Sequence, residues 1–192
     1  MRQIKTPFKP DYRPYIIAGL ISFDMGRMMG KGLEQKFDVH KKGFASKLLE
    51  KMDAIKPYIN PLVDKTIVDF EVDNDSESIR NGYDILSKGG REGLHNKGNN
   101  FHVGATKILH FINPHFFPII DSNAAKTFRE LYNFPYRKST QPGYSGDRYL
   151  RSMMKIKEVI LNYGLEKFRT LEPGTPTLRI FDKLTFAYGN GW

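Results

Sequence analysis

Hydrophobic residues recur at intervals of three and four along most of this chain. Leu48, Met52 and Ile55 follow this spacing within residues 44–55, which predicts an amphipathic helix there. We expect that helix to stop before Pro57, because the residue ahead of a proline disfavours the helical conformation. The same reasoning, with capping residues at the starts and glycines at the ends, predicts helices at 15–29, 76–88, 103–112, 122–132, 147–163, 165–171 and 176–188.

The stretch 61–70 is ambiguous. The spacing of Leu62, Val63 and Ile67 fits a helix, whereas its β-branched residues allow a strand. Pro61 suits a first helical turn, so we predict a helix. Because nothing else requires a sheet, the fold class is all-α. We expect residues 1–192 to form a single-domain orthogonal helical bundle, or the same helices in two lobes.

Two segments lack the helical spacing. Residues 1–14 carry three prolines and are predicted to form an N-terminal arm, and residues 134–146 are predicted to be a long basic loop. The apolar run YIIAGLI near the N-terminus is too short to span a membrane. The 192 residues include no cysteine, which fits a reducing compartment. We therefore expect a cytoplasmic protein with no membrane partner, and the sequence leaves its oligomeric state open.

Charge is unevenly distributed. The net charge is +9, which favours a polyanionic partner. Residues 126–157 hold eight Lys or Arg against two acidic residues, whereas residues 64–77 hold six acidic residues against one lysine. Cations bind phosphates and tyrosine rings stack on unpaired bases. The candidate nucleic-acid-binding residues in the basic stretch are Lys126, Arg137, Lys138, Tyr144, Arg148 and Arg151. The simpler alternative is a solvated loop anchored by its tyrosines.

The stretch GATKILHFINPHFFPIIDSNAAKTFREL, residues 104–131, places a lysine near the start of one helix and an aspartate directly before the next. Asp121 is a good N-cap, because its carboxylate can accept the N–H groups of the following turn. On the simplest interpretation, Lys107 points to water, and Phe116 and Phe117 belong to the core.

The same stretch resembles the helix-hairpin-helix DNA glycosylases over residues 103–131. The segment IIDSNAAKTF is similar to the start of the family's second helix, where an aspartate follows two apolar residues. The segment VGATK resembles the family's glycine–lysine hairpin, although it has one glycine where the family usually has two. The resemblance implies that Lys107 is a nucleophile and Asp121 a catalytic carboxylate. It further implies a phosphate contact at Gly104 and a base pocket that includes Phe116, Phe117 and Tyr136. DNA is then a more suitable partner than RNA, and no cofactor is required.

Metal chemistry is not favoured. His95, His102, His110 and His115 lie close in sequence, but none is paired at the four-residue spacing of a strong zinc motif. We therefore predict no metal site. Whether the chain is an enzyme at all stays open. One alternative is a nucleic-acid-binding module without chemistry; another is a helical interaction or regulatory protein that docks through its acidic and basic stretches.

Overall fold

The computed structural model describes residues 13–19, 44–88, 101–134 and 145–191. These residues form α-helices and short 3-10 turns, with no strand among them, which confirms the all-α fold class. Residues 13–19 are helical. The other elements are α2 (Phe44–Ile59), η1 (Asn60–Leu62), η2 (Ile67–Asp69), α3 (Val72–Ser87), α4 (His102–Ile112), α5 (Ser122–Tyr132), α6 (Gly146–Tyr163), α7 (Leu165–Leu171) and α8 (Thr177–Gly189).

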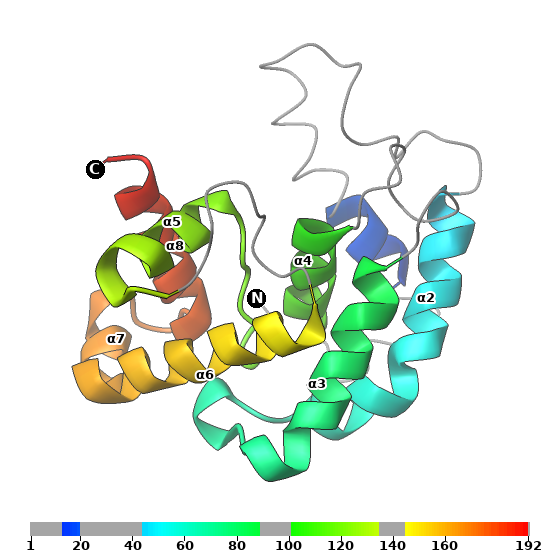
Figure 1. Cartoon of the computed structure of the whole chain (residues 1–192), viewed down its shortest axis with the longest axis horizontal. Coiled ribbons are helices and arrows are strands. Elements are labelled where there is room, and N and C mark those ends of the chain that lie inside the picture. The colour runs from blue at the N-terminus through cyan, green and yellow to red at the C-terminus, as the bar shows by residue number, and fades with distance from the viewer. Residues whose placement is uncertain (1–12, 20–43, 89–100, 135–144, 192) are drawn as a thin grey trace.

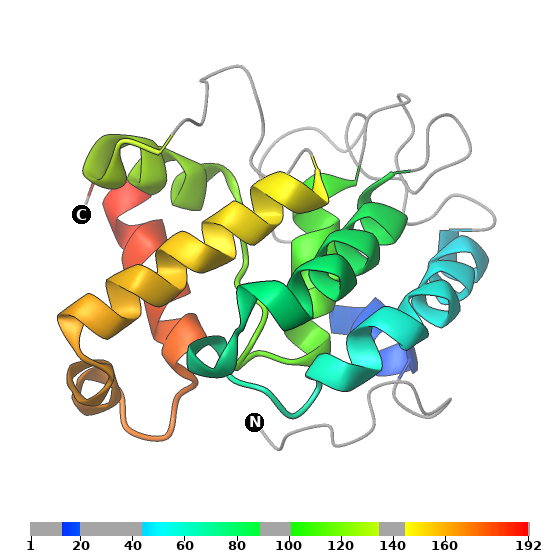
Figure 2. The ribbon, with the colours of Figure 1, turned by 60° about the horizontal axis from the view of Figure 1, so that its bottom comes forward.

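The helices gather in two groups that α6 connects. Helices α2, α3 and α4 lie on one side, α5, α7 and α8 lie on the other, and α6 runs across both (Figures 1 and 2). Their buried apolar side chains nevertheless form one continuous cluster, from Leu48 of α2 through Tyr149 of α6 to Phe181 of α8. The two groups therefore share a common core.

We expected helix α2 to stop before Pro57, but it runs two residues beyond this proline. The apolar spacing that begins at Leu48 continues to Ile59, which is fully buried. Pro57 itself is exposed, so its ring faces water. A proline in the last turn removes a single hydrogen bond. Burial of Ile59 provides a compensating gain of about 1.5–3 kcal/mol, which keeps the helix intact.

Residues 61–70 form two separate 3-10 turns rather than the predicted continuous helix. Their backbone is bonded to the segment that follows α4. The Asn113 side chain donates to the carbonyls of Leu62 and Lys65, at 2.9 and 2.8 Å, and the Ile67 N–H donates to the carbonyl of His115 at 2.8 Å. These hydrogen bonds replace some of the backbone N–H to C=O bonds that a continuous helix would make.

The start of α3 lies further toward the N-terminus than the sequence indicates. Asp75 was expected to precede the helix, but it lies in the first turn and is buried. Its carboxylate accepts hydrogen bonds from the Glu71 N–H at 2.9 Å and from the Lys65 ammonium at 2.7 Å. Asp75 therefore stabilises the helix start from within.

Several expectations concern residues outside the described part of the chain. Most of the predicted arm and loop falls there, as do four candidate site residues and one histidine: Tyr136, Arg137, Lys138, Tyr144 and His95. No helix in the described ranges is long and apolar enough to cross a membrane.

Candidate functional site

The segment between α4 and α5, residues 113–121, is held in the core by its aromatic side chains. Phe116 and Phe117 are fully buried. Their rings meet edge-on with centroids 4.9 Å apart, and Phe116 also meets the ring of Phe70 at 6.3 Å. The structure therefore gives both rings a packing role, and neither lies at an exposed surface where a base could stack.

Asp121 caps α5, as the sequence predicts. Its backbone is extended, and its Oδ1 accepts the N–H groups of Asn123 and Ala124, each at 2.9 Å. A carboxylate also interacts favourably with the positive end of the helix dipole. Because one oxygen accepts both bonds, capping leaves Oδ2 available for another partner.

Lys107 and Gly104 both lie in α4, which begins at His102. Lys107 is half-buried. Gly104 is buried within the first turn, where a Cβ would come within 2.0 Å of the Phe101 ring. Gly104 is thus a close-packing glycine inside a helix, not part of a hairpin loop.

Sequence reasoning missed a second carboxylate, Asp182 of α8. Its side chain is only 15% exposed and forms an ion pair with Arg179, one turn earlier. Burial raises the pKa of Asp182 to about 6; the nearby Asp121 carboxylate adds to the rise, whereas Arg179 and Lys107 oppose it. The charges of Lys107, Asp121 and Arg179 therefore all act on Asp182, and we call these four residues the charged cluster. They come from α4, the start of α5 and α8.

The spacing of residues along α8 could have identified Asp182. It stands four residues after Leu178 and three before Thr185, and both are buried. Residues at these intervals share one helix face. The Thr185 carbonyl also accepts a hydrogen bond from Thr127 of α5 at 3.1 Å, so this face of α8 is turned toward α5. An aspartate within an inward-facing stripe is rare and often functional.

His110 and His102 have structural partners. His110 is buried and its Nδ1 lies 2.8 Å from the Phe117 carbonyl. Burial lowers the pKa of His110 to about 4; the Phe117 carbonyl opposes this, and Arg179 adds to it. His102 lies 3.2 Å from the Tyr83 hydroxyl. Among the described residues, no three His, Cys, Asp or Glu side chains are grouped to hold a metal ion.

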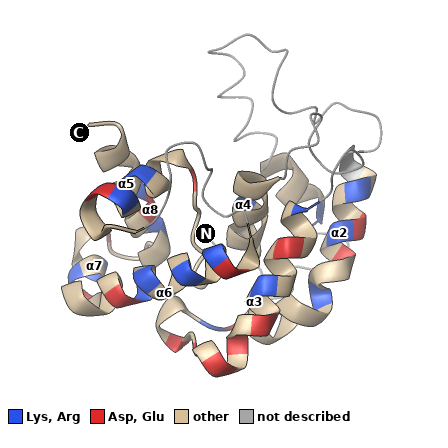
Figure 3. Cartoon of the chain, in the orientation of Figure 1, with Lys and Arg blue, Asp and Glu red and all other residues tan. Residues whose placement is uncertain are grey.

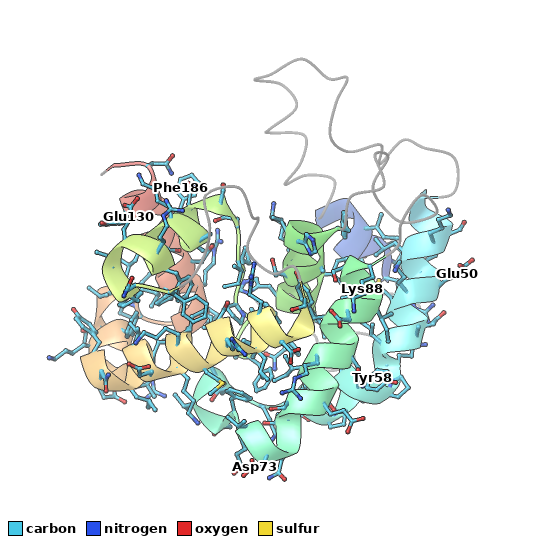
Figure 4. All side chains as sticks on the ribbon, in the orientation of Figure 1. Glu50, Tyr58, Asp73, Lys88, Glu130 and Phe186 are labelled. Atoms are coloured by element: carbon cyan, nitrogen blue, oxygen red, sulfur yellow. The ribbon has the colours of Figure 1, made fainter. Side chains whose placement is uncertain are left out.

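The basic residues of α5 and α6 are in part bonded within the chain. Lys126 donates to the Gly189 carbonyl at 3.0 Å, which satisfies its ammonium without neutralising its charge. Arg148 is half-buried at the start of α6, and Arg151 is exposed one turn later. Figure 3 shows Lys and Arg along α6 and on α5, whereas acidic residues gather at the first turns of α3, where Asp73 points outward (Figure 4). The two stretches nevertheless meet where α6 packs on this region, since Lys157 of α6 donates to the Phe70 carbonyl at 2.6 Å.

Apolar side chains are exposed near the end of α8. Leu184, Phe186 and Tyr188 are 49%, 56% and 37% exposed, and Leu131 of α5 is 51% exposed. Figure 4 shows Phe186 directed away from the core. Such side chains are compatible with a protein contact.

The charges of the predicted pair, Lys107 and Asp121, thus both act on Asp182, which is ion-paired with Arg179. Comparison of the chain with protein families, curated proteins and solved structures finds no match.

Proposed function

We propose that this chain binds DNA and removes bases from it, with Lys107 as the nucleophile and Asp121 as the carboxylate beside the sugar. The observation that supports this most directly is the charged cluster. Lys107 and Asp121 lie on different elements, yet the charge of each acts on Asp182. An ammonium and two carboxylates around one point are a suitable arrangement for chemistry at a glycosidic bond.

The chemistry follows from the charge that develops. As a base leaves deoxyribose, positive charge builds on the sugar, and a fixed carboxylate stabilises it. Two backbone N–H groups hold Asp121 through Oδ1, so its orientation does not change during the reaction. The amine of Lys107, once neutral, attacks C1′ of the sugar as the C1′–N bond to the base breaks. The nitrogen then loses a proton and the C1′–O4′ bond opens, with the oxygen taking up a proton, to give a Schiff base that leads to strand cleavage.

The charge of the chain supports a DNA partner. A net charge of +9 attracts a phosphate backbone. Arg151 presents its guanidinium on the exposed side of α6. We therefore expect affinity for a plain duplex that falls steeply with salt, and we expect Arg151→Gln to weaken it equally for different sequences.

Borohydride trapping tests the proposal. Duplexes that each carry one damaged base, or an abasic site, are incubated with the protein and reductant, and a covalent complex is scored. We expect the wild type to be trapped on at least one duplex and Lys107→Gln to be inactive. Lys56→Gln is the matched control, since Lys56 pairs with Asp53 on α2, outside the charged cluster. Asp121→Asn keeps a capping side chain but loses the charge, so we expect it to fold and to lose activity.

Other outcomes would favour the alternatives. If the wild type binds duplex DNA but no duplex is trapped or cleaved, the chain is a nucleic-acid-binding module without this chemistry. If it also fails to bind DNA at low salt, the exposed side chains of α8, Leu184, Phe186 and Tyr188, favour a protein-interaction role.

A further inference from the structure

The proposed function leaves one chemical requirement without a residue. When a neutral base leaves, the electron pair of the C1′–N bond goes to the base, which must gain a proton. Asp121 is engaged as an acceptor of two N–H groups, and Lys107 must lose a proton rather than give one to the base. A third group that can carry a proton near neutral pH is therefore needed.

Asp182 is placed to be that group. Its side chain is only 15% exposed and forms an ion pair with Arg179 of its own helix, and the charges of Lys107 from α4 and Asp121 from the start of α5 also act on it. In enzymes that cleave glycosidic bonds, two carboxyl groups in unlike environments divide the work: the more buried one stays protonated as the acid, and the other stays charged.

We propose that Asp182 donates the proton that the leaving base takes up as the glycosidic bond breaks. The inference rests on the proposed function and adds a residue to it. The C1′–N bond breaks and its electron pair goes to the base, which takes the Asp182 proton; the Lys107 nitrogen, having lost a proton to water, forms the new bond to C1′. Asp182 is left as a carboxylate and regains its proton from solvent.

The protonation state of Asp182 fits this role. A pKa of about 6 keeps roughly one molecule in ten protonated at pH 7. An ordinary aspartate would be protonated in fewer than about one molecule in a thousand at that pH. The acid form is therefore accessible during turnover.

The test compares wild type, Asp182→Asn and Lys107→Gln on three duplexes. One carries a neutral damaged base, one carries N7-methylguanine, and one carries an abasic site. N7-methylguanine is already positively charged and leaves without a proton, and an abasic site has no base to release. We expect Asp182→Asn to release the neutral base about a hundredfold more slowly. It should release N7-methylguanine at close to the wild-type rate and be trapped on the abasic duplex as the wild type is, which also shows that the variant folds.

The pH profile provides a readout that does not depend on the variant's stability. For the neutral base, the ratio of the wild-type rate to the Asp182→Asn rate should fall about tenfold per pH unit above about pH 6, because only the wild type depends on the acid fraction of Asp182. A ratio that stays constant across pH 6–8 would overturn the role of Asp182.

The outcomes separate the two proposals. If Asp182→Asn releases the neutral base at the wild-type rate, Asp182 is not the proton donor, while trapping on the abasic duplex would still support Lys107 as nucleophile. If the wild type is trapped on the abasic duplex but releases no base, the Asp182 proposal also fails. If the wild type is trapped on no duplex, both proposals fail together.

Discussion

We predict that the hydrogen bonds of the Asn113 side chain are the main polar contacts that hold residues 113–121, the segment that carries Asp121, in place. It is 3% exposed. Its Nδ2 donates to the Leu62 carbonyl at 2.9 Å and the Lys65 carbonyl at 2.8 Å, and its Oδ1 accepts the His115 N–H at 3.0 Å. Asn113→Ala removes all three hydrogen bonds, so the Leu62 and Lys65 carbonyls and the His115 N–H lose this partner.

The expected cost follows from these bonds. A hydrogen bond within a protein contributes about 1 kcal/mol net, and a buried polar group left without a partner costs about 1–3 kcal/mol. The Leu62 bond is fully buried and the other two are partly buried, so water can replace some of what is lost. We expect Asn113→Ala to lower the free energy of unfolding by about 2–4 kcal/mol. Asn113→Asp has the same shape but no donor, and it should cost at least as much.

Urea unfolding followed by far-UV circular dichroism at 25 °C measures this difference. Asn74→Ala is the matched control, since Asn74 is exposed on α3 and its amide donates to the Glu71 carboxylate at 2.6 Å. The control should change the free energy of unfolding by less than about 0.5 kcal/mol. If Asn113→Ala unfolds at the same urea concentration as the control, the turns at 60–69 are not stabilised through this side chain, and our explanation of their conformation is wrong.

Three further predictions concern stability. Asp121→Ala removes the cap of α5 and should cost about 0.5–2 kcal/mol in thermal unfolding, whereas Asp121→Asn should cost much less because asparagine caps as well; equal losses would contradict the capping role. Gly146→Ala places a Cβ 2.5 Å from the Arg80 backbone, so α6 must shift on α3 at a cost of about 1–3 kcal/mol, and an unchanged melting temperature would contradict that contact. His110 binds a proton less readily in the folded state than in the unfolded state, because burial lowers its pKa to about 4. The free energy of unfolding should therefore decrease as the pH falls from 6.5 to 4, by on the order of 3 kcal/mol from this group alone. The raised pKa of Asp182 acts in the opposite direction, adding stability as the pH falls below about 6. The His110 contribution is therefore isolated by comparing urea unfolding of wild type and His110→Gln across this pH range. The same change of unfolding free energy with pH in both proteins would contradict it.

The predicted helices agree with the structure where local signals decide them. Helix α5 has the predicted bounds, because Asp121 accepts its first N–H groups and the apolar spacing runs to Tyr132. Helix α6 ends at the predicted residue, ahead of Gly164, whose φ of 101° suits glycine. The sequence also predicts its start, with Asp147 as the capping residue; in the structure the Ser145 hydroxyl accepts the Arg148 N–H, and Asp147 pairs with Arg80.

The predictions that fail are those in which a distant segment decides. Pro57 indicates a helix end, but burial of Ile59 extends α2 past it. Residues 61–70 have helical spacing, but their carbonyls bond to Asn113, about fifty residues later. For Phe116 and Phe117 the sequence leaves a core role and a base pocket both open, and only their burial and the packing of Phe116 against Phe70 show that they fill the core.

Of the four residues in the charged cluster, the sequence by itself singled out Lys107 and Asp121. Lys107 and Asp121 stand at recognisable places near helix starts, and such places depend on neighbours within one turn. Asp182 lies about sixty residues after Asp121 in the sequence, and the packing of α8 against α5 brings it within range of the Asp121 charge. Its pairing with Arg179 is local to α8, but its burial and the charges of Lys107 and Asp121 come from other elements. The tertiary structure alone therefore decided the raised pKa of this carboxyl.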